Sequence, residues 1–201
     1  IASVPFSDSA LKDYETWMGT YFQGKKLGFS YMRLEIGAEG VVAHTKVFLR
    51  MASEGVDQST TFTQDTYLTP DLKLKRFVLL QELMGHRQKI EAEVKSGRLE
   101  IQITSPDFKK KDSIPFHPTI APSATYLINI LRSGLKVGKK GKVPILVEPF
   151  QKVTDLAYTI LRKEKAELSG KQVDAYVVHQ KMRGMESTSW VTTSGMVLRE
   201  E

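Results

Sequence analysis

The sequence predicts a mainly β protein: a large curved antiparallel sheet, or half-open β-barrel, of about 10–12 strands with one helix packed on its concave face. Three observations support this prediction. Apolar and polar residues alternate with period two along most of the chain, which is typical of half-buried antiparallel strands. Short turns rich in glycine or proline separate these runs. One segment, at about 123–134, instead has apolar residues at helical spacing.

The first half of the chain begins with an aromatic-rich pair of strands. Residues 17–22 and 27–31 flank the turn 23–26 and predict a β-hairpin. Alternation continues after the hairpin, with polar turns between the runs, over residues 41–51, 59–66, 72–75, 90–95 and 98–103. The stretch 15–104 therefore predicts a meander of about seven strands.

Residues 105–122 interrupt this pattern, with four prolines around the lysine run Lys109-Lys110-Lys111. We interpret the segment as an irregular crossing between two parts of one curved sheet, because neither half of the chain has a helix that could cover it alone. The prediction is therefore a single β-rich domain over residues 1–201. Its first 13 residues have no periodic pattern and are expected to be poorly ordered.

The predicted helix begins after Pro122-Ser123, where Ser123 is the expected N-cap, and ends at Gly134. Leu127, Ile130 and Leu131 form its apolar stripe. Strand patterns then resume from residue 143 to residue 199, which predicts a second antiparallel meander of about five strands.

Composition excludes several classes of protein. The chain has 201 residues, 41% of them hydrophobic and 26% charged, which is typical of a globular protein and not of a disordered one. No apolar run approaches the ~18 residues of a membrane-spanning helix. The absence of cysteine removes disulfides, thiolate metal ligands and cysteine nucleophiles.

The net charge of +6 raises the question of an anionic partner. The basic residues concentrate in Lys109–Lys111 and in Lys139, Lys140 and Lys142, next to turn-forming residues. No aromatic residue alternates with these lysines, as a single-strand-binding groove would require. We therefore expect solvated lysine loops and no nucleic-acid partner, with binding to an anionic surface as the alternative.

No catalytic or metal-binding pattern is present in the sequence. The four histidines, His44, His86, His117 and His179, fall in separate predicted elements and at no metal-ligand spacing. No Gly-x-Ser-x-Gly motif occurs. The glycines of Gly134–Gly141 follow a helix and precede a strand, the reverse of a phosphate-binding loop. We therefore expect no enzymatic activity, no metal and no cofactor.

The aromatic residues leave two interpretations open. They either fill an ordinary core or line an apolar cavity between the curved sheet and the helix. For the cavity, the candidate ligand-binding residues are Trp17, Tyr21, Phe29, Tyr31, Tyr126, Leu127, Ile130 and Leu131.

Several short motifs resemble bacterial envelope proteins whose later portion is a transglutaminase-like, papain-type domain. The hairpin Trp17–Tyr31 resembles their opening, and it is followed in order by 69–74, 134–138 and 195–200, which resemble later turns and a closing hairpin. The resemblance implies a non-catalytic β-rich region that precedes the enzyme. The catalytic Cys, His and Asp of that family belong to the downstream domain. At the level of fold, the pattern also resembles the half-barrel of periplasmic lipoprotein carriers.

These considerations lead to two functional expectations. The first is a non-enzymatic accessory domain of a cell-envelope protein that binds a ligand or a protein partner and is fused to a downstream transglutaminase-like domain. The alternative is a stand-alone periplasmic carrier that binds the acyl chains of a lipid or lipoprotein in an apolar cavity. Both imply a periplasmic or otherwise extracytoplasmic location after removal of a signal segment.

Overall fold

The computed structural model describes residues 11–53 and 56–201, so most of the N-terminal segment that is predicted to be poorly ordered lies outside the described residues. The chain divides into two compact units, residues 17–118 and residues 1–16 together with 119–201. The division falls inside the predicted crossing segment 105–122. The single domain over residues 1–201 stays a prediction, and each unit is described here by itself.

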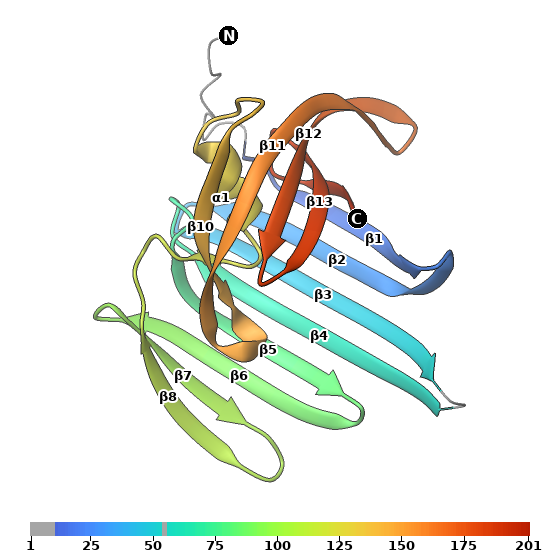
Figure 1. The fold of residues 1–201 in the computed structure, drawn as a ribbon. Coiled ribbons are helices and arrows are strands. Elements are labelled where there is room, and N and C mark those ends of the chain that lie inside the picture. The colour runs from blue at the N-terminus through green and yellow to red at the C-terminus, as the bar shows by residue number, and fades with distance from the viewer. Residues whose placement is uncertain (1–10, 54–55) are drawn as a thin grey trace. The chain divides into compact units, whose positions relative to one another are not determined.

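The first unit contains an eight-stranded sheet in which each strand is the neighbour of the next along the chain (Figure 1). The pairings from β2 to β8 are all antiparallel, as the meander pattern predicts. The strands are β1 (Tyr14–Phe22), β2 (Lys25–Gly37), β3 (Gly40–Ser53), β4 (Val56–Leu68), β5 (Leu74–Leu83), β6 (His86–Lys95), β7 (Arg98–Thr104) and β8 (Lys109–Pro115).

The eight-stranded sheet has one buried face and one polar face. Leu34, Ala43 and Ile90 belong to the buried face. The residues next to these along each strand lie on the opposite face, which includes Arg33 and His44. Alternation in the sequence therefore predicts correctly which side of β3, β6 and β7 is buried.

Strand β8 corrects the expectation of an irregular crossing and of a lysine loop at residues 109–111. Lys109 to Pro115 pair with β7 along their whole length, from Lys109 opposite Thr104 to Pro115 opposite Arg98. The prolines of this region flank the strand or end it, so the ladder does not lose an interior N–H donor. Exposed lysines on such an edge strand discourage pairing with another chain.

The second unit contains a six-stranded sheet in the order β14-β13-β12-β11-β10-β9. Its neighbours are antiparallel except for the short β9, which runs parallel to β10. Its elements are β9 (Ala121–Pro122), α1 (Tyr126–Arg132), β10 (Lys140–Val147), the 3₁₀ helix η2 (Glu148–Phe150), β11 (Lys152–Leu168), β12 (Lys171–Met182), β13 (Met185–Thr192) and β14 (Val197–Glu200).

Helix α1 is shorter than the predicted 123–134. Thr125, not Ser123, is its N-cap residue, and the backbone N–H of Ser123 instead donates to Glu148 Oε1 at 3.0 Å. Gly134, with a φ of +115°, ends this region as predicted.

The predicted apolar stripe packs against one face of the six-stranded sheet. Leu127, Ile130 and Leu131 belong to a buried cluster with residues of β10 to β13, among them Ile145, Leu156, Ile160, Val178 and Val191. The fold class is thus mainly β with one helix packed on a sheet. The described residues form fourteen strands in two sheets, compared with the predicted number of about 10–12.

Candidate functional site

An aromatic cluster lies on the polar face of the eight-stranded sheet. The Trp17 ring centroid is 4.5 Å from that of Tyr31 and 5.4 Å from that of Phe29. Phe29 in turn stacks on Phe48, with ring centroids 5.8 Å apart. These four residues, Trp17, Phe29, Tyr31 and Phe48, are called the aromatic platform below.

Strand register places the aromatic platform on this face. Phe29 pairs directly with Phe48, and Tyr31 pairs with Lys46. Arg50, Lys46 and His44 lie on the same face of β3 as Phe48, while Ala43 and Val41 are buried on the other. Phe48 is therefore an aromatic residue at a position that the alternation assigns to polar residues.

Gly28 allows β2 to approach β3 closely beside the platform. A Cβ atom at position 28 would lie only 1.8 Å from the backbone oxygen of Phe48. No side chain fits there without a shift of the backbone, so glycine maintains the pairing that aligns Phe29 with Phe48.

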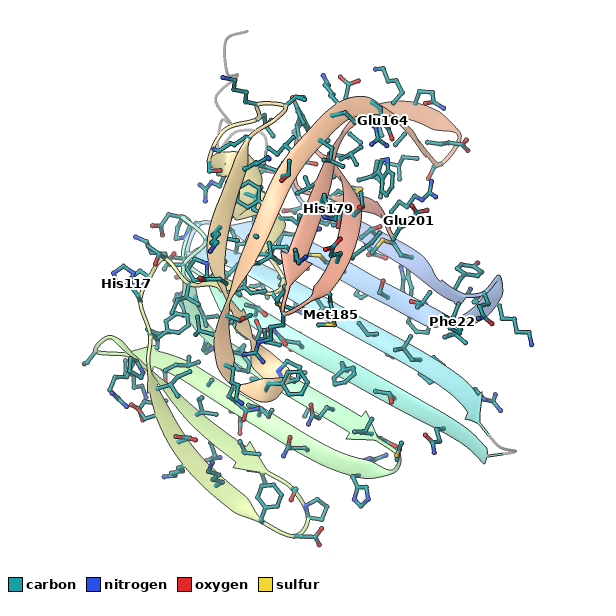
Figure 2. All side chains as sticks on the ribbon, viewed as in Figure 1. Phe22, His117, Glu164, His179, Met185 and Glu201 are labelled. Atoms are coloured by element: carbon teal, nitrogen blue, oxygen red, sulfur yellow. The ribbon has the colours of Figure 1, made fainter. Side chains whose placement is uncertain are left out.

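Much of the aromatic platform is accessible. Trp17 is 61% exposed, whereas Phe29, Tyr31 and Phe48 are half-buried. Further along β1, Tyr21 is 62% exposed and its ring lies over Gly19. Phe22, at the end of β1, is also exposed (Figure 2). The contiguous, partly exposed rings of the platform are typical of a binding surface.

A shallow hollow of about 630 Å³ adjoins the platform on the same face. Thr61 and Thr63 of β4 line it and pair with Phe48 and Lys46, respectively. Leu80 of β5, also exposed, contributes an apolar side chain to the hollow. On its other side, Arg87 Nε donates to Glu82 Oε2 at 2.8 Å. Lys89 also lines the hollow, and its Nζ lies 2.7 Å from Glu91 Oε1, so the hollow combines hydroxyl groups, an apolar surface and ion-paired side chains.

The structure separates the eight candidate cavity residues into two groups. Trp17, Phe29 and Tyr31 come together on the polar face of the eight-stranded sheet, with Tyr21 further along β1. The four helix residues lie in the other unit, where Leu127, Ile130 and Leu131 are 0–6% exposed in the packed cluster. Tyr126 packs against the same cluster, and its burial raises the pKa of its hydroxyl.

One site residue was not among the sequence candidates. Phe48 completes the aromatic platform, and its signal in the sequence was an aromatic side chain on an otherwise polar strand face. A ligand function for the eight candidates stays a prediction.

His44 has a structural environment on the polar face, next to the platform. Its Nδ1 lies 2.7 Å from Asp65 Oδ1, and its Nε2 lies 3.5 Å from Glu35 Oε2. The imidazole therefore bridges β2, β3 and β4 through two carboxylates. Among residues 11–53 and 56–201, no group of three His, Cys, Asp or Glu side chains is arranged to hold a metal ion.

Comparisons with known proteins identify the fold. No family model and no curated protein matches the sequence. A β-barrel-like protein of the domain of unknown function DUF1849 from Brucella abortus matches with a TM-score of 0.63 and 12% identity, over 94% of this chain and 88% of that one. A DUF1089 family protein from Pseudomonas aeruginosa matches with a TM-score of 0.55 and 16% identity, over 92% and 95% of the two chains.

The chain has a β-barrel-like fold. At these identities the likeness establishes the architecture alone, because one fold can carry unrelated functions. In the part of the chain that the structure describes, no helix is long and apolar enough to cross a membrane.

Proposed function

We propose that this chain is a non-enzymatic binding domain of a bacterial cell-envelope protein and that the aromatic platform is its binding surface. The observation that carries the proposal is the exposed Trp17 packed on Phe29 and Tyr31. Isolated apolar side chains on a surface need no explanation, but a contiguous aromatic cluster exposes surface that a ligand could cover.

The surroundings of the aromatic platform favour a saccharide as the ligand. The C–H face of a sugar ring stacks on an aromatic ring, whose face carries partial negative charge. The sugar hydroxyls need hydrogen-bonding partners, and Thr61, Thr63 and the Glu82–Arg87 pair line the adjoining hollow. We therefore propose an envelope glycan as the ligand.

An acyl chain fits these surroundings less well. A lipid carrier needs an enclosed apolar cavity, whereas the hollow beside the platform is open to solvent. The helix residues that were candidates for lining such a cavity are packed against β10 to β13. The experiment below therefore also tests whether the chain acts as a stand-alone lipid carrier.

The envelope location and a fused transglutaminase-like domain are also part of the proposal. They are supported only by the resemblance of the Trp17–Tyr31 hairpin and the later motifs to such proteins. The two solved structures with this fold bear on the architecture alone.

The test is a titration of the protein with soluble glycan strands released from peptidoglycan, followed by calorimetry. We expect binding by the wild type and affinity about tenfold weaker or more for Trp17→Ala, because loss of one stacking contact removes about 1.4 kcal/mol. Phe150→Ala is the matched control, since Phe150 is 68% exposed but lies in the other unit. It should bind like the wild type.

Three results would overturn parts of the proposal. Equal binding by Trp17→Ala and wild type would exclude the aromatic platform. If the wild type fails to bind glycan but releases lipid on organic extraction and binds an apolar dye, the carrier function replaces the proposed one. Hydrolytic or ligase activity of the purified chain would contradict a non-enzymatic role.

A further inference from the structure

A second hollow lies on the six-stranded sheet, on the face opposite helix α1. It has a volume of about 460 Å³ and involves β10, β11 and β12. Its charged lining residues are all basic or imidazole groups, Lys140, Lys142, His179 and Lys181. Figure 2 labels His179 on β12.

The strand register arranges these four residues in two rows. Lys140 of β10, Thr159 of β11 and His179 of β12 are consecutive partners across the sheet. Lys142, Ala157 and Lys181 form the adjacent row. Residues two apart on a strand are separated by ~6.8 Å, and alternate strands by ~9.6 Å. The four basic residues therefore lie at the corners of a rectangle on the sheet, with the small side chains of Ala157 and Thr159 between them.

The positive charge of this hollow is only partly neutralised. Glu186 Oε1 lies 2.7 Å from Lys181 Nζ, and its Oε2 lies 3.5 Å from His179 Nε2. Among the described residues, neither Lys140 nor Lys142 forms an ion pair. Asp155 occupies the next position of β11 on the same face, opposite Pro144.

Elsewhere on the same sheet, a carboxylate binds both members of a lysine pair. Lys163 and Lys165 of β11 are also two residues apart on one face, and Asp174 of β12 binds both, at 2.8 and 2.6 Å. In the hollow, the positions of β11 that face Lys140 and Lys142 hold Thr159 and Ala157 instead. The register thus leaves space and uncompensated charge where the other pair has a carboxylate.

We propose that this hollow binds the phosphate group of an anionic ligand. The side chains of Lys140 and Lys142 would form charge-assisted hydrogen bonds to the phosphate oxygens, and the Thr159 hydroxyl would donate another. The site is independent of the aromatic platform and goes beyond the proposed function. It also gives a role to lysines that the sequence suggested were only solvated.

The experiment uses the full chain and inorganic phosphate as the probe, with binding followed by the backbone amide shifts of 140–142, 157–159 and 179–181. We expect saturable shifts at these residues. Lys140→Ala combined with Lys142→Ala should weaken the affinity about tenfold or more, since it removes two charge-assisted contacts. Glu186→Gln should strengthen it, because the carboxylate that pairs with Lys181 and His179 loses its charge.

The matched control is Lys163→Ala combined with Lys165→Ala, which removes the same formal charge from the same sheet. This control should change the phosphate affinity by less than about twofold, because these lysines lie outside the hollow and Asp174 already binds both of them. If both double variants lose the same amount of phosphate affinity, phosphate is attracted only by the net charge of the protein, and the proposed site is overturned. Absence of saturable shifts in the wild type would also overturn it.

A second arm identifies the source of the phosphate. In this arm, the protein is sedimented with vesicles that contain an anionic phospholipid. If it co-sediments, and if the Lys140 and Lys142 substitutions weaken this binding as they weaken phosphate binding, the phosphate belongs to a lipid headgroup. Phosphate binding without vesicle binding would show a free phosphate ligand. Either result supports the site, and neither depends on glycan binding at the aromatic platform.

Discussion

Single residues determine how closely the strands of the eight-stranded sheet approach each other. Gly28 permits a close approach of β2 to β3, because the backbone oxygen of Phe48 occupies the space where a Cβ atom would lie. Backbone atoms cannot rotate away as a flexible side chain can. A side chain at position 28 would therefore push β2 and β3 apart and destabilise their pairing. The pairing in turn aligns Phe29 with Phe48 in the aromatic platform.

We expect Gly28→Ala to lower the free energy of unfolding by about 2 kcal/mol or more, at the upper end of the range for overpacking. Gly37→Ala is the control within the same strand, because its Cβ would make an ordinary contact of 3.7 Å with the backbone oxygen of Gly40. Urea denaturation of both variants gives the comparison. A loss for Gly28→Ala no larger than for Gly37→Ala would contradict the close approach.

At the scale of elements, a carboxylate on β12 forms ion pairs with two lysines of the long strand β11. The register of these strands shifts between Ile160 and Arg162, and just beyond the shift Asp174 binds both Lys163 and Lys165. Hydrogen bonds from Lys163 and then Lys165 lower the pKa of Asp174 from 3.8 to about 2. The ion pairs are exposed, so their effect on stability is small and depends on salt.

The pKa of Asp174 predicts the direction of a pH effect. Because the pKa is lower in the folded chain, the stabilisation is complete above the ordinary value of 3.8 and is lost as the pH falls towards about 2. We therefore expect Asp174→Asn to be less stable than the wild type at pH 5, with a difference that shrinks towards pH 2.

Urea denaturation of wild type and Asp174→Asn across this range measures the effect. Asp155→Asn serves as a control, because Asp155 is an exposed aspartate of β11 that forms no ion pair in the described structure. A difference between wild type and Asp174→Asn that is constant with pH would show that the two lysines do not interact with Asp174.

At the scale of the whole molecule, the two compact units carry different candidate sites. The eight-stranded unit has the aromatic platform, and the six-stranded unit has the basic hollow. The likeness to the DUF1849 and DUF1089 structures extends over 92–94% of this chain, so it includes both units.

The proposed fusion to a downstream domain predicts the size of the native protein. The chain described here has a mass of 22.7 kDa, so the processed protein purified from its own cells should be well above that mass. Intact-mass spectrometry measures this directly. A mass near 22.7 kDa would contradict the fusion and would favour a binding protein that acts alone.

Local patterns predicted most of the secondary structure. Alternation specifies which side of a strand is buried, and glycine-containing turns specify where strands end, so the strands of residues 15–104 were recognisable in sequence. Strand β8 was missed because its flanking prolines and its lysine run resemble a loop. Only pairing with β7 shows that the lysines lie on an edge strand.

The candidate sites were less predictable, because they depend on residues that the chain brings together across strands. The sequence by itself determined a mainly β fold, the helix near residues 123–134 and the aromatic hairpin, since each of these follows from neighbouring residues. Only the tertiary structure decided that Phe48 joins Trp17, and that Lys140 and Lys142 face His179 and Lys181. The physical reason is register: a shift of one residue in pairing turns every side chain of a strand to the other face.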